Sequence, residues 1–441
     1  MKNYPKKTIG ELCNIVKGET GIASAIAGEY PLVVTAKERK TSATHQFDTQ
    51  AVCIPLVSSS GHGKKSLNHV HYQEGKFALG TILAAVIPKN NHEISANFLH
   101  QYLLFYKDTK IVPLMRGAAN VSLAVKDIAK IEIPLPPIDE QKDFIVFFNE
   151  LQRFNYALVQ EFNNQEKYVS QLKQAILQEA IAGQLTADWR KQNLMQKGNP
   201  DTDAAALLAK IKTEKQQLIA DGKLKKEKPL AEIDSFALYE LPHNWKWTRL
   251  GDITESLRYG TSQKCSYSKV GIPVLRIPNL KDGMIDKSDL KYTLMSDTEI
   301  KNYSLYQEDI LMIRSNGSKS LVGRASIVSS DCEGYAYAGY LVRLRFTPNS
   351  LISNFLYLVF ESKFVRDQIE IPVRTTTGVK NINSTEILNL IIPLPPLAEQ
   401  KAIVEKVDKL MNIIDQLEQQ IKHRKQLAQA LMQTVLREAF E

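Results

Sequence analysis

The side chains best suited to chemistry in this 441-residue chain are arginine, lysine, asparagine and serine, gathered in short polar segments after apolar runs. Such side chains form paired hydrogen bonds with the edges of guanine and adenine, and they also grip phosphates. In the first half of the chain the candidate nucleic-acid contacts are Lys37, Arg39, Lys40, Ser59, His62, Lys64, Lys65, Arg116 and Asn120. In the second half they are Arg276, Asn279, Arg314, Asn316, Ser318, Lys319, Arg374, Thr376, Lys380 and Asn381. The alternative for each of them is an ordinary polar turn.

Motifs for catalysis are not found. Residues 61–66, GHGKKS, suggest a phosphate-binding loop, but Ser58 stands five residues before Gly63, where a Walker A motif requires glycine. The chain has no HExxH or GxSxG motif, and it lacks the Asn-Pro-Pro-Tyr type of motif of adenine methyltransferases. Its four cysteines are scattered without a CxxC pair, which argues against zinc and disulfides and favours a reducing cytoplasm. We therefore expect a binding protein with no catalytic residues and no metal.

The positive charge lies in two separate blocks. The formal net charge is +8, of which residues 1–133 carry +6 and residues 245–391 carry +4, whereas residues 139–182 carry −3. Two basic blocks favour a polyanionic partner. No apolar run approaches the roughly 20 residues needed to cross a bilayer, so no membrane partner is expected.

An internal repeat reveals the elements that must position the polar loops. Residues 133–142, IPLPPIDEQK, recur as residues 392–401, IPLPPLAEQK, with eight of ten positions identical at an offset of 259. The paired prolines favour an extended segment, and the acidic residues that follow suit a helix N-terminus. The sequence therefore predicts a duplicated chain.

A long amphipathic helix is predicted after each repeat. Beyond residue 396 the apolar residues recur at alternating steps of four and three, which is the pattern of a coiled-coil seam. The first copy runs from residue 144 to 176, and residues 171–175 match residues 426–430 at an offset of 255. This match predicts a first helix longer by four residues, about one turn. Two such helices would act as spacers that hold the basic blocks apart.

Each basic block is predicted to be a mixed α/β domain, because several short apolar strands surround one amphipathic helix. The expected boundaries are a first domain over 1–138, a first long helix over 139–183, a connector over 184–244, a second domain over 245–396 and a second long helix over 397–441.

The twin IPLPP-x-x-EQK segments, each followed by a coiled-coil helix, resemble the conserved regions of type I restriction-modification specificity subunits. Residues 183–190, GQLTADWR, and residues 241–247, LPHNWKW, strengthen the resemblance, which covers essentially the whole chain. It implies two target-recognition domains that each read one half of a split site in the major groove. It also implies an α/β (α+β) fold in which the two long helices pack antiparallel and give a pseudo-two-fold repeat.

The resemblance further implies a set of partners. These are double-stranded DNA, two modification subunits that methylate adenine, and two ATP-driven restriction subunits. S-adenosylmethionine, ATP and Mg²⁺ would then be used by the partner subunits, and this chain would bind no cofactor. Two alternatives stay open: a coiled-coil scaffold with two peptide- or RNA-binding modules, and a fused enzyme whose active site is not recognised.

Overall fold

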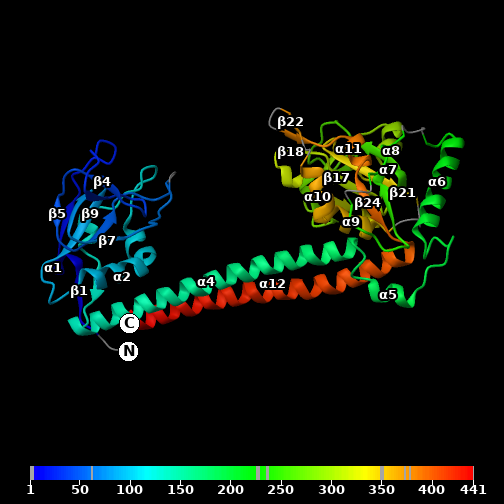
Figure 1. Ribbon diagram of the computed structural model, residues 1–441. Coiled ribbons are helices and arrows are strands. Elements are labelled where there is room, and N and C mark those ends of the chain that lie inside the picture. Colours follow the sequence, from blue (N-terminus) through cyan, green and yellow to red (C-terminus); the bar gives the residue numbers. More distant parts are fainter. Residues whose placement is uncertain are drawn as a thin grey trace. The chain divides into compact units, whose positions relative to one another are not determined.

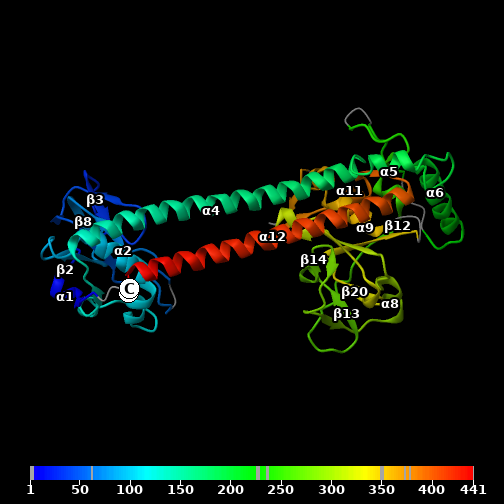
Figure 2. The same ribbon diagram turned by 90° about the horizontal axis from the view of Figure 1, so that it is seen from below.

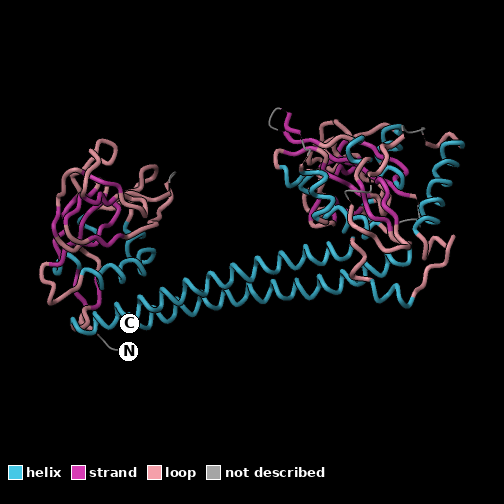
Figure 3. Tube along the Cα trace, in the orientation of Figure 1, coloured by secondary structure: helices cyan, strands magenta, loops and turns pink. Residues whose placement is uncertain are grey.

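The structure is a computed structural model that describes residues 4–60, 63–224, 229–234, 238–347, 352–371, 374–376 and 379–440. The chain divides into two compact units, one formed by Met1–Gln165 with Ile421–Glu441 and the other by Glu166–Gln420. Helices α4 (Ile138–Ile181) and α12 (Leu397–Phe440) each contribute to both units (Figure 1). The strands lie within the globular parts, while these two segments are helical throughout (Figure 3).

The first unit contains two four-stranded sheets, ordered β2-β9-β6-β7 and β4-β3-β8-β5. Its strands are β1 (Lys6–Thr8), β2 (Cys13–Lys17), β3 (Tyr30–Val33), β4 (Lys40–Ser42), β5 (Phe47–Asp48), β6 (Ala51–Pro55), β7 (His71–Gln73), β8 (Lys76–Leu79), β9 (Leu83–Pro88) and β10 (Glu132–Pro134). Its short helices are α1 (Ile9–Leu12), α2 (Ala96–Tyr106), η1 (Lys107–Ile111), η2 (Val112–Leu114) and α3 (Val125–Ile128). Helix α2 buries Phe98 and Leu99 against Val52, Ile54 and Val86 of the first sheet, which forms the main core of the unit.

The second unit contains a four-stranded sheet ordered β12-β21-β17-β19 and several smaller sheets. Its strands are β11 (Lys246–Arg249), β12 (Thr254–Tyr259), β13 (Ile272–Leu275), β14 (Leu280–Lys281), β15 (Met284–Ile285), β16 (Lys291–Thr293), β17 (Ile310–Ile313), β18 (Ser315–Asn316), β19 (Ala325–Ile327), β20 (Ala336–Tyr337), β21 (Leu341–Phe346), β22 (Arg374–Thr376), β23 (Val379–Asn381) and β24 (Ile391–Leu394). Its shorter helices are α5 (Ala187–Gln192), α6 (Ala204–Ala220), α7 (Leu250–Ile253), η4 (Ile277–Asn279), α8 (Asp297–Tyr303), η5 (Lys319–Leu321), η6 (Ser330–Cys332), α9 (Ser353–Glu361), α10 (Lys363–Glu370) and α11 (Ser384–Leu388).

The two units share one backbone frame, centred on a tight turn at residues 80–82 and at residues 338–340. Three backbone hydrogen bonds hold each turn. In the first unit they are Gly80 N to Val33 O at 3.0 Å, Thr81 N to Thr20 O at 3.1 Å and Leu56 N to Ile82 O at 2.8 Å. In the second unit they are Ala338 N to Leu275 O at 2.9 Å, Gly339 N to Thr261 O at 2.8 Å and Arg314 N to Tyr340 O at 3.0 Å. The duplication therefore extends through the interior of both domains.

The long helices follow one register, and the expected insertion of four residues is wrong. Both helices contain 44 described residues. Buried and half-buried positions recur every seven residues at Gln141, Phe148, Asn155, Phe162, Val169 and Ile176, and at Gln400, Val407, Ile414, Ile421, Ala428 and Val435. These positions correspond at a constant offset of 259. The match of residues 171–175 with residues 426–430, at an offset of 255, does not reflect the helix register. It rests on similar polar helix composition, and its leucines, Leu172 and Leu427, are 45% and 55% exposed rather than buried in the seam.

Within the second unit the two long helices run antiparallel. Lys173 Nζ lies 3.3 Å from Asp415 Oδ1 and 2.9 Å from Glu418 Oε2, and Lys406 Nζ donates to Leu185 O at 2.8 Å. From α4 to the residues that follow it, contacts later in the chain therefore fall earlier on α12. The mixed α/β fold with antiparallel long helices is thereby confirmed. Among the described residues, no helix combines the length and apolarity needed to cross a membrane.

The glutamine of each EQK motif fastens a domain to its long helix. Gln141 and Gln400 are 0% exposed. Gln141 Oε1 accepts from Ser95 N, the N-cap of α2, at 2.9 Å, and Gln400 Oε1 accepts from Ile352 N, the N-cap of α9, at 3.0 Å. Helix α9 accordingly lies next to α12 in both views (Figures 1 and 2). One side chain therefore performs the same task in both copies.

The glutamate of the second EQK motif, Glu399, binds both the 183–190 segment and the 241–247 segment through its carboxylate. Glu399 is 0% exposed, and its carboxylate accepts from Thr186 Oγ1 at 2.7 Å, from Asn244 Nδ2 at 3.1 Å and from Trp245 Nε1 at 2.8 Å. Arg190 also forms an ion pair with it. The GQLTADWR and LPHNWKW segments thus supply the hydrogen-bond donors and the cation that the buried Glu399 carboxylate requires.

Candidate nucleic-acid interface

In the first unit the structure brings together two of the polar segments expected from the sequence. Loop 58–66 follows strand β6, and loop 116–122 runs beside it. Ser58 N donates to Val121 O at 3.0 Å, and Val57 and Ser122 form a β-bridge. Two segments about 60 residues apart in sequence therefore form one surface.

A glycine makes this close approach possible. Gly63 has φ of +74°, and a Cβ built there would lie 2.2 Å from Ala118 O. Around this contact the exposed candidate side chains are Ser59, Lys64, Lys65, Arg116 and Asn120. Arg116 is 79% exposed, and its guanidinium lies 3.8 Å from the carboxylate of Asp127, whose side chain is 6% exposed. These exposed groups can meet an anionic ligand.

The third polar segment of the first unit is fastened to strand β7 by Arg39. Its guanidinium donates to Gln73 Oε1 at 3.0 Å and to Lys37 O at 3.1 Å, and it lies 3.1 Å from His71 Nδ1. Because arginine has no acceptor, His71 must accept through Nδ1 and stay neutral. Burial, reinforced by Arg39, lowers the pKa of His71 to about 4. Arg39 thus supports the loop, whereas Lys37 and Lys40 are exposed.

In the second unit a small sheet joins two polar segments that are about 60 residues apart. Strand β18 pairs with β23, with Ser315 opposite Asn381 and Asn316 opposite Lys380, and β23 pairs with β22. Asn316 Oδ1 accepts from Ser318 N at 2.8 Å, which shapes the tip of its loop. The structure therefore places these candidates on one ribbon.

Arg314 connects this ribbon to the 338–340 turn. Its guanidinium lies over the Tyr259 ring at 4.2 Å, and Nη1 donates to Gly339 O at 3.4 Å. The exposed candidates beside it are Ser318 and Lys319.

Asn279 has a structural part in the second unit. Its side chain is 1% exposed, and its Nδ2 donates to Asp286 O and to Asp289 O, each at 2.9 Å. Its Oδ1 accepts from Arg276 N at 2.8 Å. Arg276 in turn pairs with Asp289 at 2.7 Å. The geometry therefore supports Asn279 as a residue that positions Arg276, with no surface of its own to offer to a base.

The structure leaves three of the candidates without described side chains. His62 lies outside the described residues. Arg374 and Thr376 belong to strand β22, but their side chains are not described.

The shared frame identifies a lysine that sequence reasoning missed. Leu32 of β3 pairs with Lys40 of β4, and Val274 of β13 pairs with Lys291 of β16. Lys291 therefore occupies the position of Lys40. The common x-Pro-apolar-apolar segments at residues 30–33 and 272–275 were the signal that could have found it.

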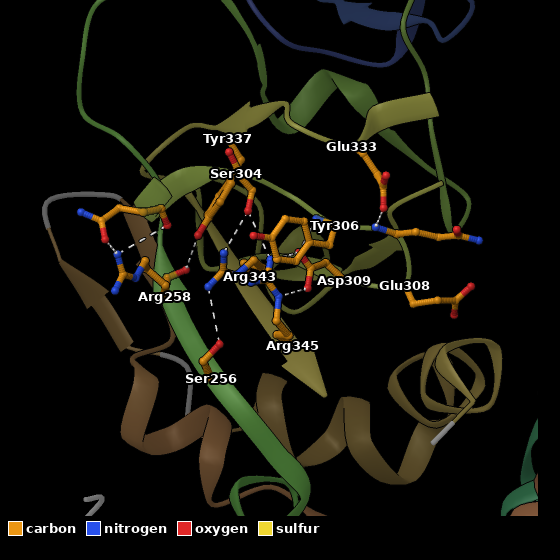
Figure 4. A network of polar contacts seen from close by, with 12 residues as sticks. Ser256, Arg258, Ser304, Tyr306, Glu308, Asp309, Glu333, Tyr337, Arg343 and Arg345 are labelled. Atoms are coloured by element: carbon orange, nitrogen blue, oxygen red, sulfur yellow. Dashed lines mark hydrogen bonds and ion pairs between the residues drawn. The ribbon is translucent and has the colours of Figure 1, made fainter. Parts of the chain in front are cut away.

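Two other arginines of the second basic block form polar contacts within the domain (Figure 4). Arg345 forms a bidentate pair with Asp309, with Nε to Oδ1 at 2.7 Å and Nη2 to Oδ2 at 2.6 Å. Arg343 is 4% exposed, donates to Ser304 O at 3.1 Å, and has its pKa lowered by burial. These cations hold the domain together, so the charge counted over 245–391 overstates what the surface presents.

The arrangement is suited to binding. Over the part of the chain that the structure describes, no group of three or more His, Cys, Asp or Glu side chains could hold a metal ion. All four cysteines are free. What the two units present instead are exposed cations and amides on loops held by a common frame.

Comparison with known proteins identifies relatives. The family model of the type I restriction modification DNA specificity domain matches residues 1–168 and 242–424. The chain is 26% identical to the type I restriction enzyme EcoKI specificity subunit of Escherichia coli strain K12, over 75% of this chain and 61% of that protein. It is 28% identical to the EcoAI specificity subunit of Escherichia coli, over 67% of this chain and 55% of that protein. The chain thus spans between 55% and 61% of the length of these two relatives.

A solved structure supports the fold. A chain from work on complex assembly and conformational transition of the type I R-M system matches with a TM-score of 0.63 at 14% identity, covering 100% of this chain and 98% of that one.

Proposed function

Because the chain belongs to the type I restriction modification DNA specificity family, we propose that it is the DNA-recognition subunit of a type I restriction-modification enzyme. Each of its two domains then reads one half of a bipartite site. The chain itself performs no catalysis.

The observation that carries this proposal is that the two domains share the same backbone arrangement around the 80–82 and 338–340 turns but carry different side chains on it. The three hydrogen bonds of the 80–82 turn and of the 338–340 turn match, yet most residues at equivalent positions differ, Thr20 and Thr261 being alike. Val34 corresponds to Arg276, Leu56 to Arg314 and Ile82 to Tyr340. A constant backbone with changed side chains suits two domains that read two unlike half-sites, because base edges are distinguished by side-chain donors and acceptors.

Selection from a random library tests the proposal directly. The full-length chain, alone and with its modification subunit, is incubated with randomised duplex DNA, and the bound fraction is sequenced. We expect two short specific segments separated by unread bases, and exchanging residues 245–396 for those of another family member should change only one segment. Binding without sequence preference, or preference for RNA or peptides, would refute the proposal and favour a scaffold.

Salt dependence provides a second test. Neutralised phosphates release counterions, so affinity for duplex DNA should fall about a thousandfold or more between 50 and 200 mM salt. An affinity independent of salt would contradict the proposed role of the exposed cations.

The long helices are proposed to set the spacer between the half-sites. Removing one heptad from both helices keeps the buried seven-residue repeat and shortens each by about 10 Å. At 3.4 Å per base pair the preferred spacer should shorten by about three base pairs. An unchanged spacer in this variant would count against helices as rulers.

The same helices are proposed to dock two modification subunits. Apolar side chains are exposed at matching positions: Phe154 (66%), Tyr168 (63%) and Leu172 (45%) on α4, and Ile413 (55%), Leu427 (55%) and Leu431 (65%) on α12. An apolar stripe outside the buried seven-residue repeat suits a further amphipathic helix. Because the stripe occurs once on each copy, the partner should bind twice.

Native mass spectrometry of the assembled complex tests this docking. Phe154→Ser or Ile413→Ser alone should leave one modification subunit bound, and the double variant should leave none. Gln419→Ser, on an exposed face of α12 away from Ile413 and Leu427, is the control and should retain both. Two subunits bound to the double variant would exclude this surface.

Cofactors and location follow from the same proposal. S-adenosylmethionine, ATP and Mg²⁺ act in the modification and restriction subunits, and the restriction subunits are the nuclease partners of the assembly. The purified chain alone should therefore turn over neither S-adenosylmethionine nor ATP in the presence of Mg²⁺. A protein that reads cellular DNA in this way works in the cytoplasm.

A further inference from the structure

We propose that Tyr340 is a specificity-determining residue of the second domain, and that it reads a base pair beside Lys291 at the mouth of one cavity. This inference rests on the proposed function. Neither residue belongs to the polar segments identified from the sequence.

Tyr340 stands on a rigid part of the frame. Its carbonyl accepts from Arg314 N at 3.0 Å, and its neighbour Gly339 donates to Thr261 O at 2.8 Å. A Cβ built at Gly260 would lie 2.3 Å from both Ala338 O and Tyr337 O, so another strand end packs tightly against the turn. A side chain on such a backbone is held in place before any ligand arrives, which lowers the entropic cost of binding.

The turn also lies among the segments already considered for DNA contact. Arg314, which begins the β18 ribbon, bonds to it on one side, and Leu275, which precedes Arg276, bonds to it on the other. A residue at this position is therefore next to both groups of polar candidates.

The Tyr340 ring itself is available to a ligand. It is 62% exposed, so most of its surface contributes nothing to the core. The equivalent residue of the first unit, Ile82, instead packs partly buried against a hydrophobic core. The same backbone position thus carries an internal aliphatic group in one domain and an exposed aromatic group in the other.

The cavity beside Tyr340 has the chemistry of a nucleic-acid surface. Its volume is about 580 Å³, and the residues lining it include Gln263, Arg276, Lys291 and Tyr340. None of its described lining residues is acidic. Lys291 Nζ lies 4.7 Å from the centre of the Tyr267 ring, which is itself on a 64% exposed side chain.

Cations interleaved with exposed aromatic rings fit a polyanion that also presents flat or methyl-bearing bases. In this arrangement Lys291 neutralises a neighbouring phosphate, while Arg276 stays paired with Asp289 in the cavity wall. The Tyr340 ring contacts one base, and its hydroxyl can donate to or accept from that base's edge. Lys291 therefore contributes affinity, and Tyr340 contributes discrimination.

The test compares full-length variants by selection from randomised duplex DNA, followed by affinity measurements on single-base changes of the selected site. We expect Tyr340→Ala to reduce discrimination about tenfold at one position of the half-site read by the second domain, the range that one base contact provides. The other half-site should be unchanged. Lys291→Ala should weaken binding to all sequences alike and reduce the salt dependence.

Two further variants sharpen the result. Tyr340→Phe keeps the ring, so loss of discrimination in this variant would assign it to the hydroxyl, and retention would assign it to ring contact. Met284→Ala, which removes a 71% exposed side chain elsewhere in the same unit, is the control and should bind as the parent does.

An unchanged sequence profile in Tyr340→Ala, or a uniform loss of affinity across all sequences, would overturn this inference alone. Failure of the parent chain to select any sequence would instead overturn the proposed function, so the two failures are distinguishable.

Discussion

Replacing Glu399 by glutamine tests how the connector and the second domain are held to helix α12. The substitution keeps the volume of the side chain but removes its charge and one acceptor oxygen. Arg190, only 16% exposed, would lose its ion partner, and the new amide group would face donors such as Trp245 Nε1. Breaking a buried pair costs about 3–5 kcal/mol. At roughly 2–4 °C per kcal/mol for a domain of this size, the melting temperature should fall by about 10 °C.

Calorimetry of the full-length chain measures this effect. The matched control is Glu140→Gln in the first copy, where a half-buried carboxylate accepts from Tyr4 Oη at 2.7 Å. That loss should cost only about 1 kcal/mol. The double variant Glu399→Gln with Arg190→Gln should be less destabilised than the sum of the single variants, because the stranded cation is gone. If Glu399→Gln melts no earlier than Glu140→Gln, or if the double variant is additive, the buried-pair account is incorrect.

Three further predictions concern stability and the reading frame. Because the pKa of His71 falls from 6.5 to about 4 on folding, the unfolded chain binds more protons between these values, so acidification from pH 6.5 to 4 should remove roughly 3 kcal/mol of stability. Urea unfolding across this range should show a smaller loss of stability in His71→Gln than in the parent; equal slopes would rule out this titration. Gln141→Ala and Gln400→Ala should each lower the free energy of unfolding by about 2 kcal/mol, because a buried N–H at a helix N-cap loses its acceptor, and thermal melts that differ strongly between the two would argue against a shared task. Gly260→Ala should lower the free energy of unfolding by about 2 kcal/mol and weaken DNA binding, because the added Cβ would displace the 338–340 turn. Gly317→Ala is the control, since its Cβ would meet nothing within 4 Å, and it should change stability by less than about 0.5 kcal/mol. Similar values for the two variants in urea titrations would show that the turn tolerates a Cβ.

The motif residues and the proposed reading residues differ in their physical setting. Gln141, Gln400 and Glu399 are fully buried and hydrogen-bonded, so they can vary little without a cost in stability. Lys64, Lys319 and Tyr340 are exposed on a frame held by backbone hydrogen bonds. Such positions can change side chain without disturbing the fold, which is what a protein that reads different DNA sites requires.

Local features of the sequence were enough to determine the duplication, the two long helices and the polar segments. Proline fixes the backbone of its own residue and restricts the preceding one, and helical periodicity appears within a few turns. The repeated IPLPP-x-x-EQK segment therefore predicts the same junction between a domain and its long helix twice in the chain. Gln141 and Gln400 are the same residue at equivalent positions of the repeat, and both are buried at that junction in the structure.

Contacts between distant segments decided the rest. The pairing of Asn316 with Lys380, the burial of Asn279 and the internal position of Arg343 depend on neighbours far along the chain. The common frame was hidden because its defining bonds join backbone groups, which are the same for every residue except proline, so Ile82 and Tyr340 can occupy one position without any likeness in sequence. For the same reason, the side chain exposed on that frame could be recognised only once the backbone around it was folded.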